Sequence, residues 1–298
     1  MTALAYTRTG AGAPLVLLHG IGSSRHAWEP VIPALRGQFD VIAVDLPGFG
    51  DSGPLPPGAE PRPAALAAAV AGLLDDLGIT FPHVAGNSLG GWVALELAGL
   101  RPVASLALLS PAGLWRGNMP RYDQASLRAS RWFARHASGL LYRLVNYRLG
   151  RALVLGQTHG RPFHISPGYA RTAIRALGTC PGFGATMNAT VRPYRSGPAI
   201  AAPVTVAFGS RDLMLLRHQS RHLDELPPGT RLETLSRCGH VPMADDPAAV
   251  TAFIAAAAGA GDPGQLSRRQ AQKARCGSGS PPPGTGSAGP VGGRPRRA

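Results

Sequence analysis

The sequence has almost no lysine, few cysteines and no long apolar run. Lys273 is the single lysine among its 298 residues, so nearly all of the 30 basic residues are arginine. Cys180, Cys238 and Cys276 form no CxxC pair or disulfide framework, which suits a reducing compartment. No apolar stretch reaches the roughly 18 residues of a membrane span, and the first residues lack the pattern of a signal peptide. We therefore expect a cytoplasmic protein. Since no His/Cys/Asp spacing is typical of a metal site, we expect neither metal nor other cofactor.

The charge is strongly positive and unevenly distributed. The 30 basic and 16 acidic residues give a net charge of +14, which by itself points to nucleic acid or an anionic membrane surface. Residues 1–112 and 199–258 together carry −4, whereas 113–198 carry 13 arginines, one acid (Asp123) and a net +12. Residues 259–298 carry +6. This tail lacks aromatic residues among its basic ones, so we do not expect nucleic-acid binding.

Short apolar runs alternate with helical patterns along most of the chain. Continuous apolar runs typical of buried parallel strands lie at 14–18 and 39–44, and further strand signals lie at 84–85 (the end of a short strand), 104–109, 204–208 and 231–235. Helical patterns lie at 63–77, 89–100 and 247–258. This alternation predicts an α/β fold with a mostly parallel central sheet flanked by helices.

Two segments differ from this pattern. Residues 113–198 contain helical stretches and nothing like a buried strand, so we expect them to form a helical, arginine-rich cap over the sheet. Residues 259–298 are dominated by Gly, Pro, Ser and Arg, a composition that buries too little apolar surface to offset ordering entropy. We expect the core to comprise 1–112 and 199–258, and the tail to be disordered.

The strongest chemical signal is a G-x-S-x-G motif at residues 86–90, between a predicted strand and a predicted helix. A serine on such a tight turn projects its hydroxyl above the sheet, and the glycines avoid clashes within the turn. The helix N-terminus adds N–H donors near a developing oxyanion. Ser88 is therefore the candidate nucleophile.

An acid and a histidine follow in the order that a serine nucleophile needs. Asp212 stands just past the strand at 204–208, and His240 stands in the loop before the last helix. A serine hydroxyl needs a base to take its proton, and the histidine needs a carboxylate to fix its tautomer. Ser88, Asp212 and His240 fill these roles in the order of one triad lineage.

The chain resembles the α/β-hydrolase superfamily, with some similarity to its meta-cleavage-product C–C hydrolases. The resemblance covers roughly residues 3–258 and is carried by the segments HGIG (19–22), DLPGFGDS (45–52), GNSLGG (86–91), GSRD (209–212) and CGHVPM (238–243).

The resemblance implies a catalytic role for each of these motifs except one. It implies Ser88 as nucleophile, His240 as base and Asp212 as orienting acid, with an oxyanion hole formed by the backbone N–H groups of Ile21 and Leu89. The loop at 45–52 matches a structural loop of the family. The resemblance also implies an α/β-hydrolase fold with the helical cap inserted after the sixth strand.

The N-terminal segment looks short for this family. Only one strand, near Leu4 to Thr7, fits before the strand at 14–18. We therefore expect seven strands in the sheet rather than eight.

The residue type at the nucleophile position limits the reactions that the protein can catalyse. Relatives that open epoxides or displace halide carry aspartate where Ser88 stands. We expect a serine hydrolase of carboxylesterase type that cleaves an ester, thioester or lactone. Asn87 beside the nucleophile is similar to the C–C hydrolases of ring-fission products, although Val241 follows His240 where those relatives usually carry tryptophan. Two alternatives stay open: C–C hydrolysis, and a ligand-binding or degenerate member without activity.

The sequence also suggests pocket residues and partners for the cap. His19, Asn87 and Trp28 are candidates because they lie near the oxyanion loop and the nucleophile, and His159 and His164 because the cap segment around them is bounded by Gly and Pro. We expect a small-molecule or acyl substrate, and the cap arginines have three interpretations. They form a solvated face that reflects a bias towards arginine over lysine; or one of them, such as Arg161 or Arg192, pairs with a substrate carboxylate; or the cap docks on an anionic membrane surface. The sequence carries no signal for an oligomeric state.

Overall fold

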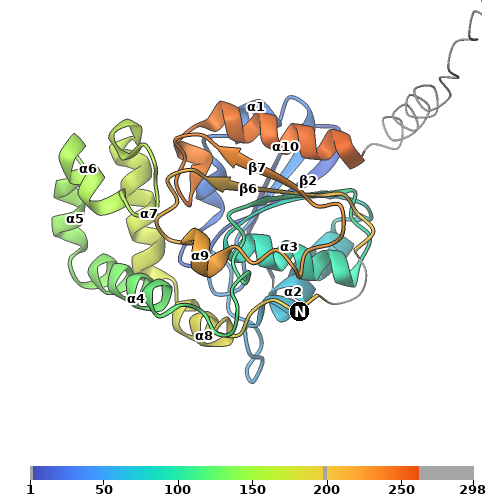
Figure 1. Cartoon of the computed structure of the whole chain (residues 1–298), viewed down its shortest axis with the longest axis horizontal. Helices are drawn as coiled ribbons and strands as arrows, with labels where there is room; N and C mark the ends of the chain where they lie inside the picture. Colours follow the sequence, from blue (N-terminus) through green and yellow to red (C-terminus); the bar gives the residue numbers. More distant parts are fainter. Residues whose placement is uncertain (1–2, 197–199, 262–298) are drawn as a thin grey trace, which may run out of the picture. The chain divides into compact units, whose positions relative to one another are not determined.

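The computed structural model describes residues 3–196 and 200–261, which contain a seven-stranded sheet covered by helices on both faces (Figure 1). The strand order is β1-β3-β2-β4-β5-β6-β7; β1 runs antiparallel to β3, and all other neighbours are parallel. The predicted mostly parallel, seven-stranded sheet is confirmed. The strands are β1 (Tyr6–Thr9), β2 (Ala13–Leu18), β3 (Phe39–Val44), β4 (His83–Asn87), β5 (Ser105–Leu109), β6 (Val204–Gly209) and β7 (Arg231–Leu235).

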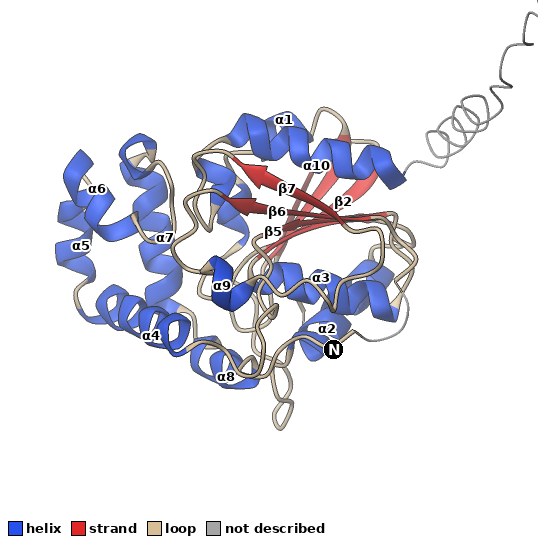
Figure 2. Cartoon of the chain, viewed as in Figure 1, coloured by secondary structure: helices blue, strands red, loops and turns tan. Residues whose placement is uncertain are grey.

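Both faces of the five inner strands are buried, which explains their apolar runs, whereas the edge strands β1 and β7 are largely exposed. Figure 2 shows α1 (Ile32–Leu35) and α10 (Pro247–Gly261) on one face, and α2 (Pro63–Asp76) and α3 (Leu89–Leu100) on the other. Side chains of β2 alternate between these two layers: Val16 packs into the cluster that contains α2 and α3, and Leu17 into the cluster with α1 and α10.

The strand order reverses direction between β2 and β4. From β2 the chain adds β3 on one side and then crosses to add β4 on the other, so the loops after β2 and β4 diverge at neighbouring strand ends. A crevice at the carboxyl ends of the strands forms at such a point, and ligands of open α/β sheets bind there.

The helical insertion contains α4 (Arg121–His136), α5 (Ser138–Leu144), α6 (Arg148–Leu155), α7 (Pro167–Thr179) and α8 (Phe183–Ala189). It lies between β5 and β6, so it follows the fifth strand rather than the predicted sixth. The difference arises because a single strand precedes β2 here, and the prediction counted strands as in an eight-stranded sheet. The remaining short elements are α9 (Arg217–Ser220) and three single-turn helices, η1 (Arg25–Trp28), η2 (Pro162–His164) and η3 (Pro242–Ala244).

The cap has a small apolar core of its own, where Ala134 of α4 meets Ile174 and Ala170 of α7. At the other end of the chain, α10 ends at Gly261, slightly later than the predicted residue 258. The rest of the segment predicted to be disordered lies outside the described residues. Within the described ranges, no helix is both long enough and apolar enough to cross a membrane.

Candidate active site

Ser88 occupies a strained turn between β4 and α3. Its backbone angles, φ 53° and ψ −117°, lie in a region that non-glycine residues rarely adopt. Glycines on both sides make the turn feasible. A Cβ on Gly90 would lie 2.1 Å from the carbonyl oxygen of Leu18, and a Cβ on Gly86 would lie 2.3 Å from the carbonyl oxygen of Gly90. The motif therefore requires both glycines for steric reasons.

His240 and Asp212 form a buried pair. Nδ1 of His240 lies 3.1 Å from Oδ2 of Asp212, while Oδ1 of Asp212 accepts hydrogen bonds from the N–H groups of Met214 (3.0 Å) and Leu215 (2.9 Å). Burial would raise the pKa of Asp212, but the charge of His240 and these hydrogen bonds outweigh it, so the pKa is lowered. An ionised Asp212 assigns the imidazole proton to Nδ1 and leaves Nε2 as the basic nitrogen.

Two backbone N–H groups stand beside this constellation. Leu89 is the first residue of α3, so its N–H has no acceptor within the helix. Ile21 lies in the loop after β2, the neighbour of β4 in the sheet. The strand-order reversal thus brings the predicted oxyanion residues to the same strand ends as Ser88.

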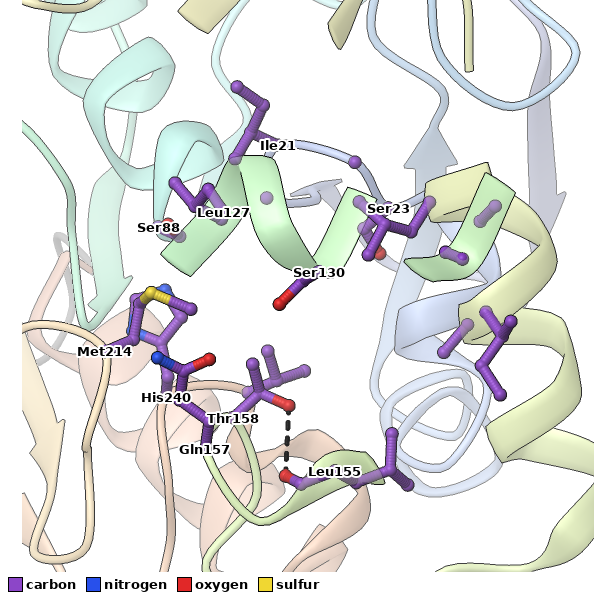
Figure 3. Close-up of a pocket in the computed structure, with 18 of the residues that line it drawn as sticks. Ile21, Ser23, Ser88, Leu127, Ser130, Leu155, Gln157, Thr158, Met214 and His240 are labelled. Carbon is purple, nitrogen blue, oxygen red and sulfur yellow. Dashed lines mark hydrogen bonds between the residues drawn. The ribbon is translucent and has the colours of Figure 1, made fainter. Parts of the chain in front are cut away.

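Ser88, His240, Ile21 and Leu89 all line one cavity of about 580 Å³ between the cap and the carboxyl ends of the strands. Figure 3 shows Ser88, His240 and Met214 gathered on one side of it, with Ser130 and Gln157 contributed by the cap. Most other lining side chains are apolar and come from the cap, among them Trp115, Leu127, Phe133, Leu141, Leu155 and Leu177.

A model of the alpha/beta hydrolase family matches residues 15–253, which include all of these site residues. The chain belongs to this family. The resemblance found in the sequence is therefore confirmed, and the fold is that of an α/β hydrolase.

Three relatives illustrate the range of similarity. The dihydrolipoyllysine-residue acetyltransferase component of the acetoin cleaving system of Pseudomonas putida is 42% identical over 121 residues, which is 40% of this chain and only 32% of that protein. A pimeloyl-[acyl-carrier protein] methyl ester esterase of Photobacterium profundum is 27% identical over 263 residues, covering 83% of this chain and 94% of the esterase. A meta-cleavage product hydrolase structure from Pseudomonas fluorescens, 22% identical, superposes with a TM-score of 0.66 over 86% of this chain and 95% of that one. This last likeness concerns the fold.

His19 does not line the cavity of this α/β hydrolase, contrary to the sequence-based expectation. The N–H of Leu46 donates to Nε2 of His19 (3.0 Å), so Nδ1 carries the proton and donates to the carbonyl oxygen of Gly20 (2.8 Å). Complete burial lowers the pKa of His19 and favours the neutral ring. Its role is to hold the loop that presents Ile21.

Asn87 and Trp28 are also absent from the lining of the cavity. The side-chain amide of Asn87 donates to the carbonyl oxygens of Leu109 (3.0 Å) and His240 (2.9 Å), so it anchors the histidine loop to the sheet. Trp28 is completely buried in the core between β2 and α10. Both predictions failed because a residue next to a catalytic motif in sequence can point into the core.

The two cap arginines predicted to meet substrate lie elsewhere. The backbone N–H of Arg161 donates to Oδ1 of Asp245 (2.9 Å), and its guanidinium lies 3.5 Å from Asp246. Arg192 is exposed and, like Arg161, does not line the cavity. Of the two candidate histidines of the cap, His159 lines the cavity, whereas His164 is exposed.

The sequence did not reveal two buried acids of the site. Asp245 accepts hydrogen bonds from the N–H groups of Gly239 (2.7 Å) and Gly160 (2.7 Å), so it joins the histidine loop to the cap. Asp123, on α4, lines the cavity. Only its isolation as the single acid of the cap segment could have drawn attention to it. In the described part of the chain, no group of three or more His, Cys, Asp or Glu side chains could hold a metal ion.

Proposed function

We propose that this α/β hydrolase is a serine hydrolase that cleaves an ester-like bond through an acyl-enzyme. The observation that carries the proposal is the shared cavity: the nucleophile on its strained turn, the imidazole held by Asp212, and two N–H donors all line the same space. The esterase from Photobacterium profundum, similar over most of both chains, supports the same reaction class.

The reaction has two halves, acylation of Ser88 and hydrolysis of the acyl-enzyme, and His240 transfers a proton in both. Oγ of Ser88 attacks the substrate carbonyl carbon while Nε2 of His240 takes its proton, and the N–H groups of Ile21 and Leu89 stabilise the oxyanion. The intermediate collapses, the leaving alcohol or thiol takes the proton from His240, and the acyl group stays on Ser88. A water molecule, deprotonated by His240, then attacks the acyl-enzyme; the acid leaves and Ser88 regains its proton.

A panel of p-nitrophenyl esters with acyl chains of different lengths tests this proposal when assayed beside a ring-fission product. Hydrolysis of at least one ester is expected, with kcat lowered roughly 10⁴-fold or more in Ser88→Ala. The side-chain amide of Asn87 is committed to two carbonyl oxygens, so it does not favour the C–C alternative. Turnover of the ring-fission product alone would establish that alternative, and no turnover of any substrate would favour a ligand-binding protein.

We also propose that the outer surface of the cap docks on an anionic lipid bilayer. In α6, which lies with α5 at the outer edge of the cap in Figure 1, Leu149 and Leu153 are both 78% exposed, while Arg151 between them is buried. The guanidinium of Arg151 donates to the carbonyl oxygen of Val145 (2.9 Å), so the apolar face of this helix turns outward. An exposed apolar patch of this kind is typical of a docking surface.

Charge and position favour a lipid partner over a second copy of the chain. Arg143 and Arg148, beside the exposed leucines, are themselves exposed, and basic residues flanking an apolar face are typical of interfacial helices. Leu140 and Leu153 are exposed and also line the cavity, so an acyl chain in the bilayer has an apolar route to Ser88.

Vesicle binding tests the docking surface. The wild type should bind vesicles that contain phosphatidylglycerol, less tightly at high salt, and should ignore vesicles of phosphatidylcholine alone. The double variant Leu149→Ser/Leu153→Ser should bind roughly tenfold more weakly or worse, whereas Leu100→Ser, another exposed leucine at the end of α3, should bind normally. Equal binding to neutral vesicles, or a dimer that only the double variant loses, would contradict the proposal.

A further inference from the structure

The cavity has a charge opposite to that of the cap that covers it. The cap segment carries a net +12, yet among the described residues that line the cavity there is no arginine or lysine. Asp123 is the single carboxylate among those lining residues. Near neutral pH the substrate space therefore faces a negative charge, whereas the sequence had suggested a positive one.

Asp123 is buried with half of its carboxylate unpaired. The residue is 1% exposed and sits in the first turn of α4. Its Oδ2 accepts a long hydrogen bond from Oγ of Ser220 (3.3 Å). Oδ1 is enclosed and has no hydrogen-bond partner in the described part of the chain. Burying an unpaired carboxylate oxygen is costly, so a purely structural residue at this position would rarely be an acid.

The charge of Asp123 is coupled electrostatically to the catalytic pair. Burial raises its pKa to about 6, and of the two catalytic groups His240 lowers the pKa while Asp212 raises it. These influences require Asp123 to lie within electrostatic reach of both. Because Ser88, His240 and Asp123 line the same cavity, a substrate attached at Ser88 shares this space with the carboxylate.

We propose that Asp123 is a specificity-determining residue whose side chain turns towards a bound substrate, so that Oδ1 accepts a hydrogen bond from a hydroxyl or ammonium group on it. This inference rests on the proposed function, because it places the donor group on the part of the substrate that fills the cavity beyond the scissile carbonyl. A donor there completes the hydrogen bonding of Oδ1. A second carboxylate on the substrate would instead be repelled, since no cationic side chain lines the described cavity. A site with a buried polar group discriminates strongly against analogues that leave it unpaired.

Matched substrates measure this preference. We would compare p-nitrophenyl esters of unsubstituted, ω-hydroxy, ω-amino and ω-carboxy acids over a series of chain lengths. At the length that matches the span from Ser88 to Asp123, kcat/KM should be roughly tenfold or more higher for the hydroxy and amino esters than for the unsubstituted ester, and lowest for the carboxy ester.

Variants separate recognition by Asp123 from a structural role. Asp123→Asn should abolish the preference for the amino ester, and Asp123→Leu should favour the unsubstituted ester over both donor-bearing esters. Ser130→Ala, which alters another polar cavity residue of α4, should keep the wild-type order. An unchanged order of substrates in Asp123→Asn would overturn the inference, whatever the stability of that variant.

Binding of small ligands to the Ser88→Ala variant, measured by calorimetry, tests the role of Asp123 separately from the proposed hydrolysis. In that background hexylamine and hexanol should bind more tightly than hexanoate, and addition of Asp123→Asn should remove the advantage of hexylamine. If the wild type hydrolyses no ester, the proposed function fails, and the amine preference still decides the role of Asp123. If esters are hydrolysed but no donor preference appears in either assay, only the role of Asp123 is refuted.

Discussion

Ser88, Ser110 and Arg237 are the non-glycine residues with positive φ in the described chain, and all three lie at carboxyl ends of strands near the site. Strained backbone persists only where the surrounding structure fixes it. At Ser88, the backbone is fixed by close packing of Gly90 against the end of β2 and of Gly86 against the first turn of α3. The strained backbone at Ser88 therefore costs the fold stability at the position of the proposed nucleophile.

Gly90→Ala tests how closely this turn is packed. The new Cβ would collide with the carbonyl oxygen of Leu18, so we expect a loss of about 2 kcal/mol or more in the free energy of unfolding, together with a large loss of activity. Gly184→Ala in α8 is the control, because no atom lies within 4 Å of the new Cβ there. Chemical denaturation of both variants checks this, and equal stability of the two would contradict it.

Asp123 should make stability depend on pH. Its pKa is raised from 3.8 to about 6 by burial, so in this window the folded chain keeps a proton that the unfolded chain has lost. Protonation of Asp123 therefore contributes fully to the free energy of unfolding below about pH 4, and this contribution is lost as the pH rises to about 6.

The variant Asp123→Asn removes this titration. It should be more stable than the wild type at pH 7, by on the order of 2 kcal/mol, and match it near pH 4. Urea unfolding at several pH values measures the difference. Ser130→Ala should follow the wild-type curve, and an Asp123→Asn variant that does the same would show that Asp123 does not titrate as stated.

The proposed nucleophile, base and acid could be selected from the sequence because each stands after a strand, and strand ends can be found from apolar runs. Asn87, Trp28 and His19 were assigned to the pocket by proximity in sequence. Their side chains are instead directed by contacts with residues far along the chain, such as the carbonyl oxygen of His240 for Asn87. Asp245 has no sequence signal, because its three N–H donors come from two separate loops.

At the scale of elements, Asp245 joins the cap to the catalytic loop. It precedes α10 and accepts N–H groups from Gly239, Gly160 and Arg161. Because Gly239 precedes His240, loss of this contact should both loosen the cap and displace the catalytic base.

Asp245→Asn should therefore lower the free energy of unfolding by about 2 kcal/mol and reduce kcat, since an amide cannot accept all three hydrogen bonds. Asp246→Asn is the matched control: Oδ1 of Asp246 accepts the N–H of Ala249 at the start of α10, and its side chain is partly exposed. We expect this control to cost about 0.5 kcal/mol and to spare kcat. Thermal unfolding and ester kinetics on both variants decide the matter, and equal effects would contradict the assigned role.

The strands were easier to predict than the cap helices. A strand buried on both faces reads as a continuous apolar run, and the strand at 39–44 has the predicted bounds. The edge strand at 231–235 also has the predicted bounds, although most of its residues are exposed. The cap helices pack on one another and around a cavity, and α6 even turns Leu149 and Leu153 outward. Their arrangement depends on tertiary contacts, which a periodic pattern does not contain.

At the scale of the whole molecule, the net charge of +14 divides into parts with different meanings. The core is slightly acidic, the cap is strongly basic, and the cavity between them holds a buried carboxylate. The basic charge of the cap therefore bears on which partner binds its outer surface. The choice of substrate depends instead on the few polar groups that face Ser88.

The central claim is that Ser88 is an activated nucleophile, and a fluorophosphonate probe tests it most directly. Such a probe phosphonylates a serine only where a base takes the proton and donors stabilise the oxyanion. Mass spectrometry of the labelled full-length chain should find one adduct, on Ser88, and Ser88→Ala should remain unlabelled while unfolding at a similar temperature. A folded wild-type protein that takes up no probe, or takes it up at another serine, would contradict the account.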